Sequence, residues 1–513
     1  MQIRMFGQRT IRGFFYGLFA AAGICALTAL GWAGVWTDKK TAASGDAAEA
    51  DREWLVLSED GRVQRSNRMT AADNAGASSG WAAAREQAQT DGQMEIQAQG
   101  AAESAELSLY ATAAVLIDAD SGRVLYGKNE DTPLAMASTT KIMTCITVLE
   151  HVEDLGEMLT VSSYAASMPK VKLYIKKGEQ YQVRELLFSL MLESHNDAAV
   201  ALAEYVGKQY LEDELRVKDT ADFSTEESKQ AVAAFAALMN AKADALECRD
   251  TYFITPNGLD ATETIVFDNG ESVVREHHTT ASDLARIMAY CITESSKRDL
   301  FLEITRTASY SFYRNGRNFT CNNHNSFLGM MEGALSGKTG FTNKAGYCYV
   351  GALCRGERTF VVALLACGWP NNKSYKWSDT KELMEYGLKY YDYREFSPEV
   401  AWGSLYVANG AAKDGNPYHS VSVPIVRKEK EEPIRLLVRE EENVIAKLTC
   451  EESLPAPVAE GTKVGTITYY LVDASGKENY LKEEGLYTGE GAGEKNFSFV
   501  AGYIFGSYLI LRK

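Results

Sequence analysis

Strand-like sequence occurs at two places far apart in the chain, and a series of helical patterns lies between them. Residues 114–118 form one strand pattern, and a turn at 119–122 leads into a second at 123–126, so a hairpin is predicted. Residues 347–353 and 358–366 predict another hairpin. Strands at both ends with helices between them favour an α+β domain whose antiparallel sheet pairs the early and late segments.

Apolar residues recur at helical spacing in the intervening chain and once after it. The helical segments are 142–149, 183–206, 231–245 and 379–391. The second of them is interrupted at 193–197, and the acidic stretch 211–230 is predicted to be a surface insertion. The sequence therefore predicts a helical subdomain beside the sheet.

The last third of the chain changes character. Short alternating strand patterns with turn residues predict a small all-β domain at 395–490. The segment 491–513 that follows is apolar, but Phe497–Leu511 is short for a full membrane span. A last core strand, an interfacial segment and a marginal membrane anchor are all compatible with it, and we favour membrane contact.

The N-terminal segment predicts export. Residues 1–12 carry three arginines, and the uncharged, mainly apolar stretch 13–36 is long enough to span a bilayer. An uncleaved anchor is favoured over a cleaved signal, and in both cases the positive end stays in the cytoplasm. Residues 37–107 are rich in Ala, Gly, Ser, Gln and Glu and predict a flexible linker.

Composition excludes several classes of function. A net charge of −16 over 513 residues argues against a nucleic-acid-binding surface. Nine cysteines form no C-x-x-C pair, and six histidines form no H-E-x-x-H motif, so neither a metal nor another cofactor is predicted. Four cysteines lie in apolar or small-residue runs and are expected to be core thiols: Cys145, Cys291, Cys348 and Cys367.

A serine and a lysine stand three residues apart in Ser138-Thr139-Thr140-Lys141. At this spacing the two side chains share one face of a helical turn, and the hydroxyl residues are suited to cap the helix. A lysine facing the apolar stripe that follows would be partly desolvated, which lowers its pKa and makes it a possible base for the serine. On its own, the motif more often belongs to a capped helix with a solvated lysine.

Two further motifs follow in a fixed order, Ser194-His195-Asn196 and Lys338-Thr339-Gly340. S-x-x-K, S-x-N and K-T-G together are the set of the penicillin-binding proteins and serine β-lactamases. Over residues 111–391 the chain resembles the D-alanyl-D-alanine carboxypeptidases, the low-molecular-mass penicillin-binding proteins. Stretches that share this resemblance are 116–122, 194–204, 257–260, 280–284 and 337–342. The resemblance implies a penicillin-binding-protein/β-lactamase-like transpeptidase fold over 108–394, followed by the β domain.

The resemblance also implies roles for the motif residues. Ser138 would be the nucleophile and Lys141 its base, with the charge of Lys338 helping to depress the pKa of Lys141. Ser194 would relay a proton toward the leaving group. Asn196 would hold Lys141 and the substrate amide by hydrogen bonds.

The third motif would recognise the substrate. Lys338 and Thr339 would bind its terminal carboxylate, and Gly340 would let the strand approach the substrate backbone closely. The backbone N–H groups of Ser138 and Phe341 would form the oxyanion hole.

These expectations combine into a membrane-associated, extracytoplasmic serine-type D-Ala-D-Ala carboxypeptidase. Its partners would be peptidoglycan stem peptides, β-lactams as acylating inhibitors, and the membrane, with no nucleic acid. A serine β-lactamase is the nearest alternative, but no E-x-x-L-N pattern follows the S-x-N motif. A non-catalytic penicillin sensor or wall-binding module is another. A Ser-His-Asp hydrolase using His195 is disfavoured because no G-x-S-x-G elbow surrounds Ser138 or Ser194.

Overall fold

The computed structural model describes residues 107–266, 270–398, 400–428 and 432–510, together with the backbone of 55–57 and 63–65. The predicted N-terminal segments 1–12 and 13–36 and most of the predicted linker 37–107 lie outside the described residues. Within that linker, β1 (Leu55–Leu57) and β2 (Val63–Arg65) pair antiparallel, so part of it has secondary structure.

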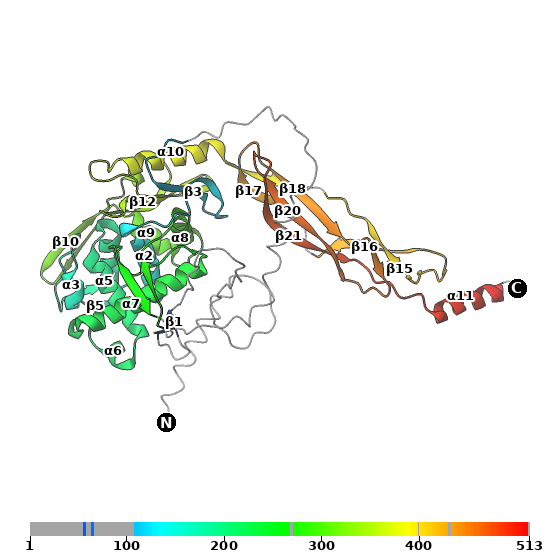
Figure 1. Cartoon of the computed structure of the whole chain (residues 1–513), viewed down its shortest axis with the longest axis horizontal. Coiled ribbons are helices and arrows are strands. Elements are labelled where there is room, and N and C mark those ends of the chain that lie inside the picture. Colours follow the sequence, from blue (N-terminus) through cyan, green and yellow to red (C-terminus); the bar gives the residue numbers. More distant parts are fainter. Residues whose placement is uncertain are drawn as a thin grey trace, which may run out of the picture. The chain divides into compact units, whose positions relative to one another are not determined.

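Residues 107–391 contain one five-stranded antiparallel sheet, in the order β11-β12-β13-β3-β4 (Figure 1). Its strands are β3 (Ala113–Asp118), β4 (Val124–Lys128), β11 (Ala334–Thr342), β12 (Gly346–Arg355) and β13 (Arg358–Leu365). In the central pairing of β3 with β13, Asp118 lies opposite Phe360 and Ala113 opposite Leu365. Both predicted hairpins and the pairing of the early and late segments are confirmed.

Helices cover both faces of this sheet, with α10 (Tyr375–Tyr390) on one side and α2 (Lys141–His151) and α8 (Ala281–Thr293) on the other (Figure 1). Leu116 of β3 joins the core on the α10 side, whereas its neighbours Val115 and Ile117 join the larger core on the α2 side. Every residue of β3 is buried, which explains why its sequence is apolar from Ala113 to Ile117. α10 begins four residues before its predicted start.

The helical subdomain contains the predicted break at 193–197. α4 (Val183–Phe188) continues into a π-helical turn over Ser189–Glu193, Ser194 adopts a left-handed conformation with φ of 64°, and α5 (Asn196–Gly207) follows. The S-x-N motif thus occupies the junction between two helices. The remaining helices here are α3 (Ser163–Ser167), α6 (Asp213–Val217), α7 (Thr225–Ala245) and α9 (Arg298–Arg306).

The predicted insertion 211–230 is mostly exposed, but its C-terminal part is helical. α7 begins at Thr225, six residues before its predicted start. Ser224 and Glu227 form a capping box there, in which each side chain accepts from the other's backbone N–H. Three two-stranded antiparallel sheets were not predicted: β5 (Met158–Thr160) with β6 (Gln180–Gln182), β7 (Thr262–Val266) with β8 (Ser272–Glu276), and β9 (Ser309–Arg314) with β10 (Arg317–Asn322).

The chain beyond α10 is built from strands, as predicted. β14 (Asp392–Phe396) crosses the predicted domain boundary and pairs with β17 (Ile434–Val438). A six-stranded sheet in the order β18-β20-β21-β16-β15-β19 encloses a separate core that includes Val407, Ile467 and Leu486. Its strands are β15 (Ser404–Ala408), β16 (Val421–Arg427), β18 (Asn443–Cys450), β19 (Ser453–Pro455), β20 (Lys463–Val472) and β21 (Glu478–Thr488).

The apolar C-terminal segment forms a helix, α11 (Phe497–Ile510), so its interpretation as a last core strand was wrong. Across the described ranges no helix is both long and apolar enough to cross a bilayer. The four cysteines expected in the core are buried free thiols, which confirms that prediction.

Candidate active site

Ser138 lies on a single 3-10 turn, η1 (Ala137–Thr140), that runs directly into α2. Lys141 is consequently the first residue of α2, and it is fully buried, whereas Ser138 is half-buried. The predicted capping by these hydroxyl residues is wrong, because neither helix start has a side-chain cap hydrogen bond. Instead, the hydroxyls of Thr139 and Thr140 donate back to the carbonyls of Met136 and Ala137.

The amine of Lys141 lies among three oxygens. Its Nζ is 2.9 Å from Ser138 Oγ, 2.9 Å from Asn196 Oδ1 and 2.5 Å from the carbonyl oxygen of Asn257. The first two neighbours were expected. The third was not, because a backbone carbonyl leaves no mark in the side-chain pattern.

The surroundings of Lys141 favour its neutral form. Burial lowers the pKa of Lys141 well below its usual value, and the positive charge of Lys338 lowers it further, against an opposing effect of Asp197. Lys338 acts through space, since its own Nζ donates to Ser194 Oγ at 3.0 Å and to the Thr339 carbonyl at 2.9 Å. Burial also lowers the pKa of Lys338, to about 7.

Asn196 and Asp197 attach a neighbouring loop to the site. The backbone N–H of Asn196 donates to the carbonyl of Val171 at 2.8 Å. The carboxylate of Asp197, which is fully buried, accepts the backbone N–H groups of Leu173 at 2.8 Å and Ile175 at 3.2 Å. The start of α5 and the loop around 171–175 are therefore held together.

The imidazole of His195 points away from the serine–lysine pair. Its Nδ1 is 2.8 Å from the hydroxyl of Ser189, in the π-helical turn. It makes no hydrogen bond to Ser138 or Ser194 among the described residues, and Asp197 is engaged by backbone N–H groups. The Ser-His-Asp arrangement is not formed.

β11 is an edge strand, and its K-T-G segment runs past the turn that carries Ser138. The motif lies inside this strand. A Cβ atom placed on Gly340 would lie 3.0 Å from the backbone nitrogen of Ser138. The next residue, Phe341, is 39% exposed, and its ring lies 4.7 Å from that of Tyr347, centroid to centroid.

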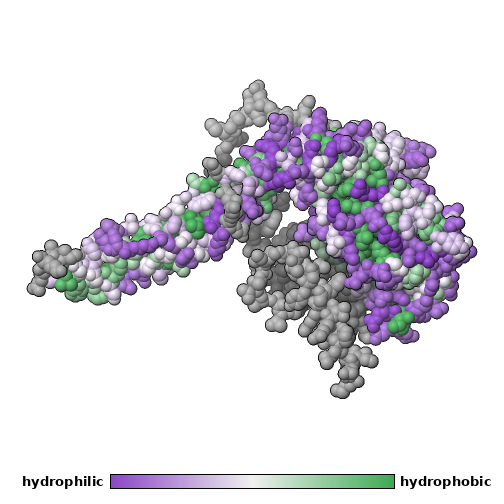
Figure 2. Space-filling view, turned by 180° about the vertical axis from the view of Figure 1, so that it is seen from behind, coloured by the Kyte–Doolittle hydropathy of each residue, from purple (hydrophilic) through white to green (hydrophobic). Residues whose placement is uncertain are grey.

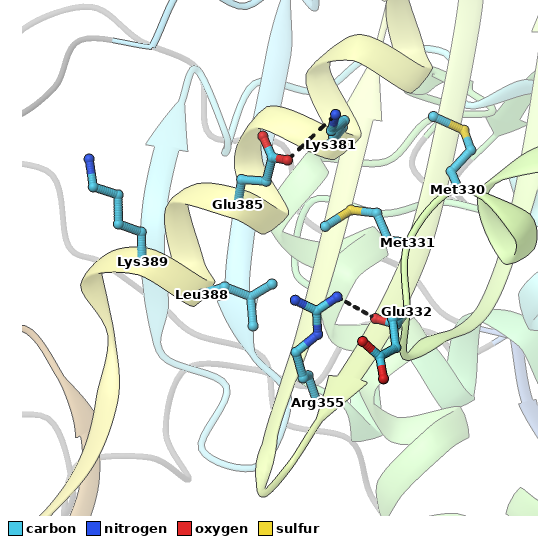
Figure 3. A pocket seen from close by; sticks show the side chains of 8 residues that line it. All are labelled: Met330, Met331, Glu332, Arg355, Lys381, Glu385, Leu388 and Lys389. Carbon is cyan, nitrogen blue, oxygen red and sulfur yellow. Dashed lines mark hydrogen bonds and ion pairs between the residues drawn. The ribbon is translucent and has the colours of Figure 1, made fainter.

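The predicted residues of all three motifs therefore come together around Ser138. Asn257 joins them, from a stretch whose resemblance to the family was noted without a role. A shallow pocket elsewhere on the domain, between α10 and the β12–β13 turn, contains none of these residues (Figure 3). In the described part of the chain, no cluster of three or more His, Cys, Asp or Glu side chains is arranged to hold a metal ion.

Comparison with known families gives the same assignment for both parts of the chain. Residues 98–210 and 227–366 match the family described as D-alanyl-D-alanine carboxypeptidase. Residues 419–489 match the C-terminal domain of penicillin-binding protein 5. The break in the first match falls in the acidic stretch that the sequence marked as an insertion.

Individual proteins that are similar to this chain carry the same family name. D-alanyl-D-alanine carboxypeptidase DacF of Bacillus subtilis is 26% identical over 373 residues, which cover 71% of this chain and 82% of that protein. D-alanyl-D-alanine carboxypeptidase DacB2 of Mycobacterium tuberculosis is 28% identical, over 57% of this chain and 84% of that protein. The crystal structure of D-alanyl-D-alanine carboxypeptidase DacD from Francisella tularensis has the same fold, with a TM-score of 0.55 and 21% identity over 79% of this chain and 98% of that one.

Fold and comparisons together define an enzyme, a serine-type hydrolase with an appended all-β domain. The chain belongs to the D-alanyl-D-alanine carboxypeptidase family.

Proposed function

We propose that the enzyme removes the terminal D-alanine from peptidoglycan stem peptides through an acyl-enzyme on Ser138, and that β-lactams acylate the same serine. The observation that carries this proposal is the buried amine of Lys141, 2.9 Å from the hydroxyl of Ser138. A serine hydroxyl is a weak nucleophile and needs a base within hydrogen-bond reach.

Lys141 is proposed as that base. Its neutral amine has two N–H bonds and one lone pair, and it has three neighbouring oxygens. Two of them, Asn196 Oδ1 and the Asn257 carbonyl, can only accept, so they take the two N–H bonds. The lone pair then faces the one neighbour that can donate, the hydroxyl of Ser138.

Ser194 and Lys338 are proposed to complete proton transfer. When Ser138 attacks the scissile carbonyl, Lys141 takes the hydroxyl proton, and the departing D-alanine amine must gain one. Ser194 can relay to that amine the proton that Lys141 has taken, which leaves Lys141 neutral again, while Lys338 keeps its own proton and orients the Ser194 hydroxyl from 3.0 Å. A water molecule then hydrolyses the ester on Ser138.

Substrate binding is assigned to the free edge of β11. The ammonium of Lys338 and the hydroxyl of Thr339 would bind the terminal carboxylate of the substrate. Gly340 leaves room for an extended peptide beside the strand, and the backbone N–H groups of Ser138 and Phe341 would bind the oxyanion. Each such donor is typically worth ~3 kcal/mol of transition-state stabilisation.

The test is fluorescent penicillin labelling of the purified protein, together with D-alanine release from a stem pentapeptide. Ser138→Ala should abolish both, whereas Ser163→Ala, an exposed serine on α3, should preserve both. Equal labelling of the Ser138→Ala variant and the wild-type protein would refute the proposal. Rapid turnover of the penicillin adduct would instead identify a β-lactamase, and labelling without D-alanine release a penicillin sensor.

Membrane association on the outer side of the cytoplasmic membrane is also proposed. The apolar segment 13–36 supports it from sequence. α11 supports it further, because its apolar side chains are exposed (Figure 2): Phe497, Ile504, Phe505 and Leu509. At about 1.5 Å per residue, its 14 residues extend about 21 Å, less than the roughly 30 Å hydrocarbon core, so α11 is suited to enter the membrane without crossing it.

Binding of the full chain to phosphatidylglycerol vesicles tests the role of α11. The double variant Phe505→Asp/Leu509→Asp should bind more weakly than the wild-type protein. Ser498→Asp adds charge at an exposed polar position of the same helix and should change binding less. Unchanged binding of the double variant would exclude α11 from the membrane contact.

A further inference from the structure

The peptide bond between Ala137 and Ser138 is held on its carbonyl side. A peptide unit is planar and trans, so its C=O and N–H point in opposite directions. Whatever fixes the carbonyl of Ala137 therefore also fixes the direction of the Ser138 N–H. Ala137 has a φ of 49°, a left-handed conformation that is unfavourable for a residue with a Cβ and persists only where surrounding contacts enforce it.

Two contacts enforce it. The buried hydroxyl of Thr140 donates to the Ala137 carbonyl at 2.8 Å. Gly258, at a φ of 80°, packs against the same carbonyl so closely that a Cβ on it would lie 1.9 Å from the oxygen. The carbonyl is thus bonded by one residue and confined by another.

The hydroxyl of Thr140 is itself oriented by His277. The imidazole is buried, and its Nδ1 accepts the backbone N–H of Ile254 at 3.0 Å. Burial lowers the pKa of His277 to about 3, so the ring is neutral and its single proton resides on Nε2. Nε2 lies 2.9 Å from Thr140 Oγ1 and donates to it, which leaves the hydroxyl proton for the Ala137 carbonyl.

We propose that His277 and Thr140 are positioning residues, which hold the Ala137–Ser138 peptide so that the Ser138 N–H points toward the oxyanion. The chain of donors runs from the backbone of Ile254 through the imidazole and the hydroxyl to the carbonyl of Ala137. Neither side chain needs to touch the substrate. The inference rests on the proposed function, in which the Ser138 N–H is one of the two oxyanion donors.

Matched variants separate this role from a general packing role. Thr140→Val keeps the shape of the side chain but removes the hydroxyl, and Thr140→Ser restores it. At His277, a glutamine places an amide N–H near the position of Nε2, whereas an asparagine reaches only the position of Nδ1. Thr139→Val is the control, because the hydroxyl of Thr139 is equally buried but donates to Met136.

The readout is the infrared stretching frequency of the ester carbonyl in the penicillin adduct, with the acylation rate beside it. Hydrogen bonds in the oxyanion hole polarise this carbonyl and lower its frequency. Thr140→Val and His277→Asn should raise the frequency and slow acylation by about 10- to 100-fold, below the 10²- to 10³-fold typical of losing a donor outright. Thr140→Ser, His277→Gln and Thr139→Val should stay close to the wild-type frequency.

Each outcome bears on one proposal. Failure of the wild-type protein to form any adduct would refute the proposed function. An adduct whose carbonyl frequency is the same in Thr140→Val, His277→Asn and the wild-type protein would overturn the positioning role alone, even if acylation slowed. Because Thr140 and His277 are tested separately, a failure of one variant to fold leaves the other to decide, and thermal melting identifies such a failure.

Discussion

Gly340 lies directly against Ser138, and there is little space for a side chain between β11 and the η1 turn at this point. A Cβ on Gly340 would lie 3.0 Å from Ser138 N and 3.1 Å from Ala137 Cβ. Gly340→Ala is therefore expected to shift the edge strand away from Ser138 by a few tenths of an ångström and to slow acylation, by less than the roughly 10²-fold cost of a 1 Å misplacement. Stopped-flow acylation by a chromogenic penicillin measures this.

Gly329→Ala is the control for that variant. A Cβ at Gly329 meets nothing within 4 Å, and its backbone needs no left-handed conformation. Its acylation rate should equal that of the wild-type protein. An unimpaired Gly340→Ala enzyme would show that the strand can move away without loss of the reactive geometry.

Activity should depend on pH on both sides of an optimum. Burial lowers the pKa of Lys338 to about 7, so the ammonium that would bind the substrate carboxylate loses its proton as the pH rises through 7. Lys141 must be neutral, so activity should also fall at low pH, below its depressed pKa. We expect a bell-shaped dependence of kcat/KM on pH.

Lys338→Arg tests the alkaline side of that profile. Arginine stays charged at every accessible pH, so the fall in kcat/KM above pH 7 should disappear, although the altered geometry lowers the maximum. A substrate whose terminal carboxylate is replaced by an amide should also lose the alkaline fall. Retention of the fall in the Lys338→Arg enzyme would assign it to another group.

The buried carboxyl of Glu204 should make stability depend on pH. Burial raises the pKa of Glu204 to about 7, although Ser162 donates to it at 2.8 Å. Between about pH 4.5 and 7 the folded protein keeps this proton while the unfolded chain loses it, so stability falls as the pH rises. The loss amounts to about 3 kcal/mol and is complete above pH 7.

Glu204→Gln removes that titration and nearly preserves the shape of the side chain. The variant should match the wild-type protein near pH 4 and exceed it by about 3 kcal/mol at pH 8, measured by urea unfolding. Parallel stability curves for the two proteins across this range would contradict the prediction.

Asp197→Asn should weaken the loop that α5 holds. The substitution replaces one carboxylate oxygen by an NH₂ group. This group cannot accept a hydrogen bond from Leu173 or Ile175, so one buried backbone N–H loses its partner. The expected cost is about 1–3 kcal/mol of stability, with reduced D-alanine release because Asn196 is attached to the same loop. Asp219→Asn, an exposed carboxylate that also accepts a backbone N–H, should cost less.

The fold was largely predictable because its signals are local. β3 is apolar up to its last residue, Asp118, because both of its faces are covered, and the turns after it and after β12 are short enough to specify hairpins. The start of α7 was missed because Ser224 and Glu227 lie in a stretch whose overall acidity suggested an exposed insertion. The β7–β8 hairpin was missed because it lacks a buried face: its residues are exposed or half-buried except Ile265.

The part of the site that is formed by side chains in recognisable motifs could be predicted from the sequence. Ser138, Lys141 and Lys338 were found because their motifs occur in a recognisable order. The carbonyl of Asn257 and the imidazole of His277 were not found, because each contacts the η1–α2 segment from more than a hundred residues away in the sequence. In addition, every residue has a backbone carbonyl, so the residue type of Asn257 gives no signal.

Because β3 pairs with β13, the sheet can be completed only after the chain has been synthesised through β13. The η1 turn with Ser138 follows β3 and β4 in the sequence. β3, however, can pair with β13 only once the chain has been synthesised through Leu365. The edge strand β11 is joined to β3 only through β12 and β13. We therefore expect chains that terminate before Leu365 not to assemble a site around Ser138 and not to be labelled by penicillin.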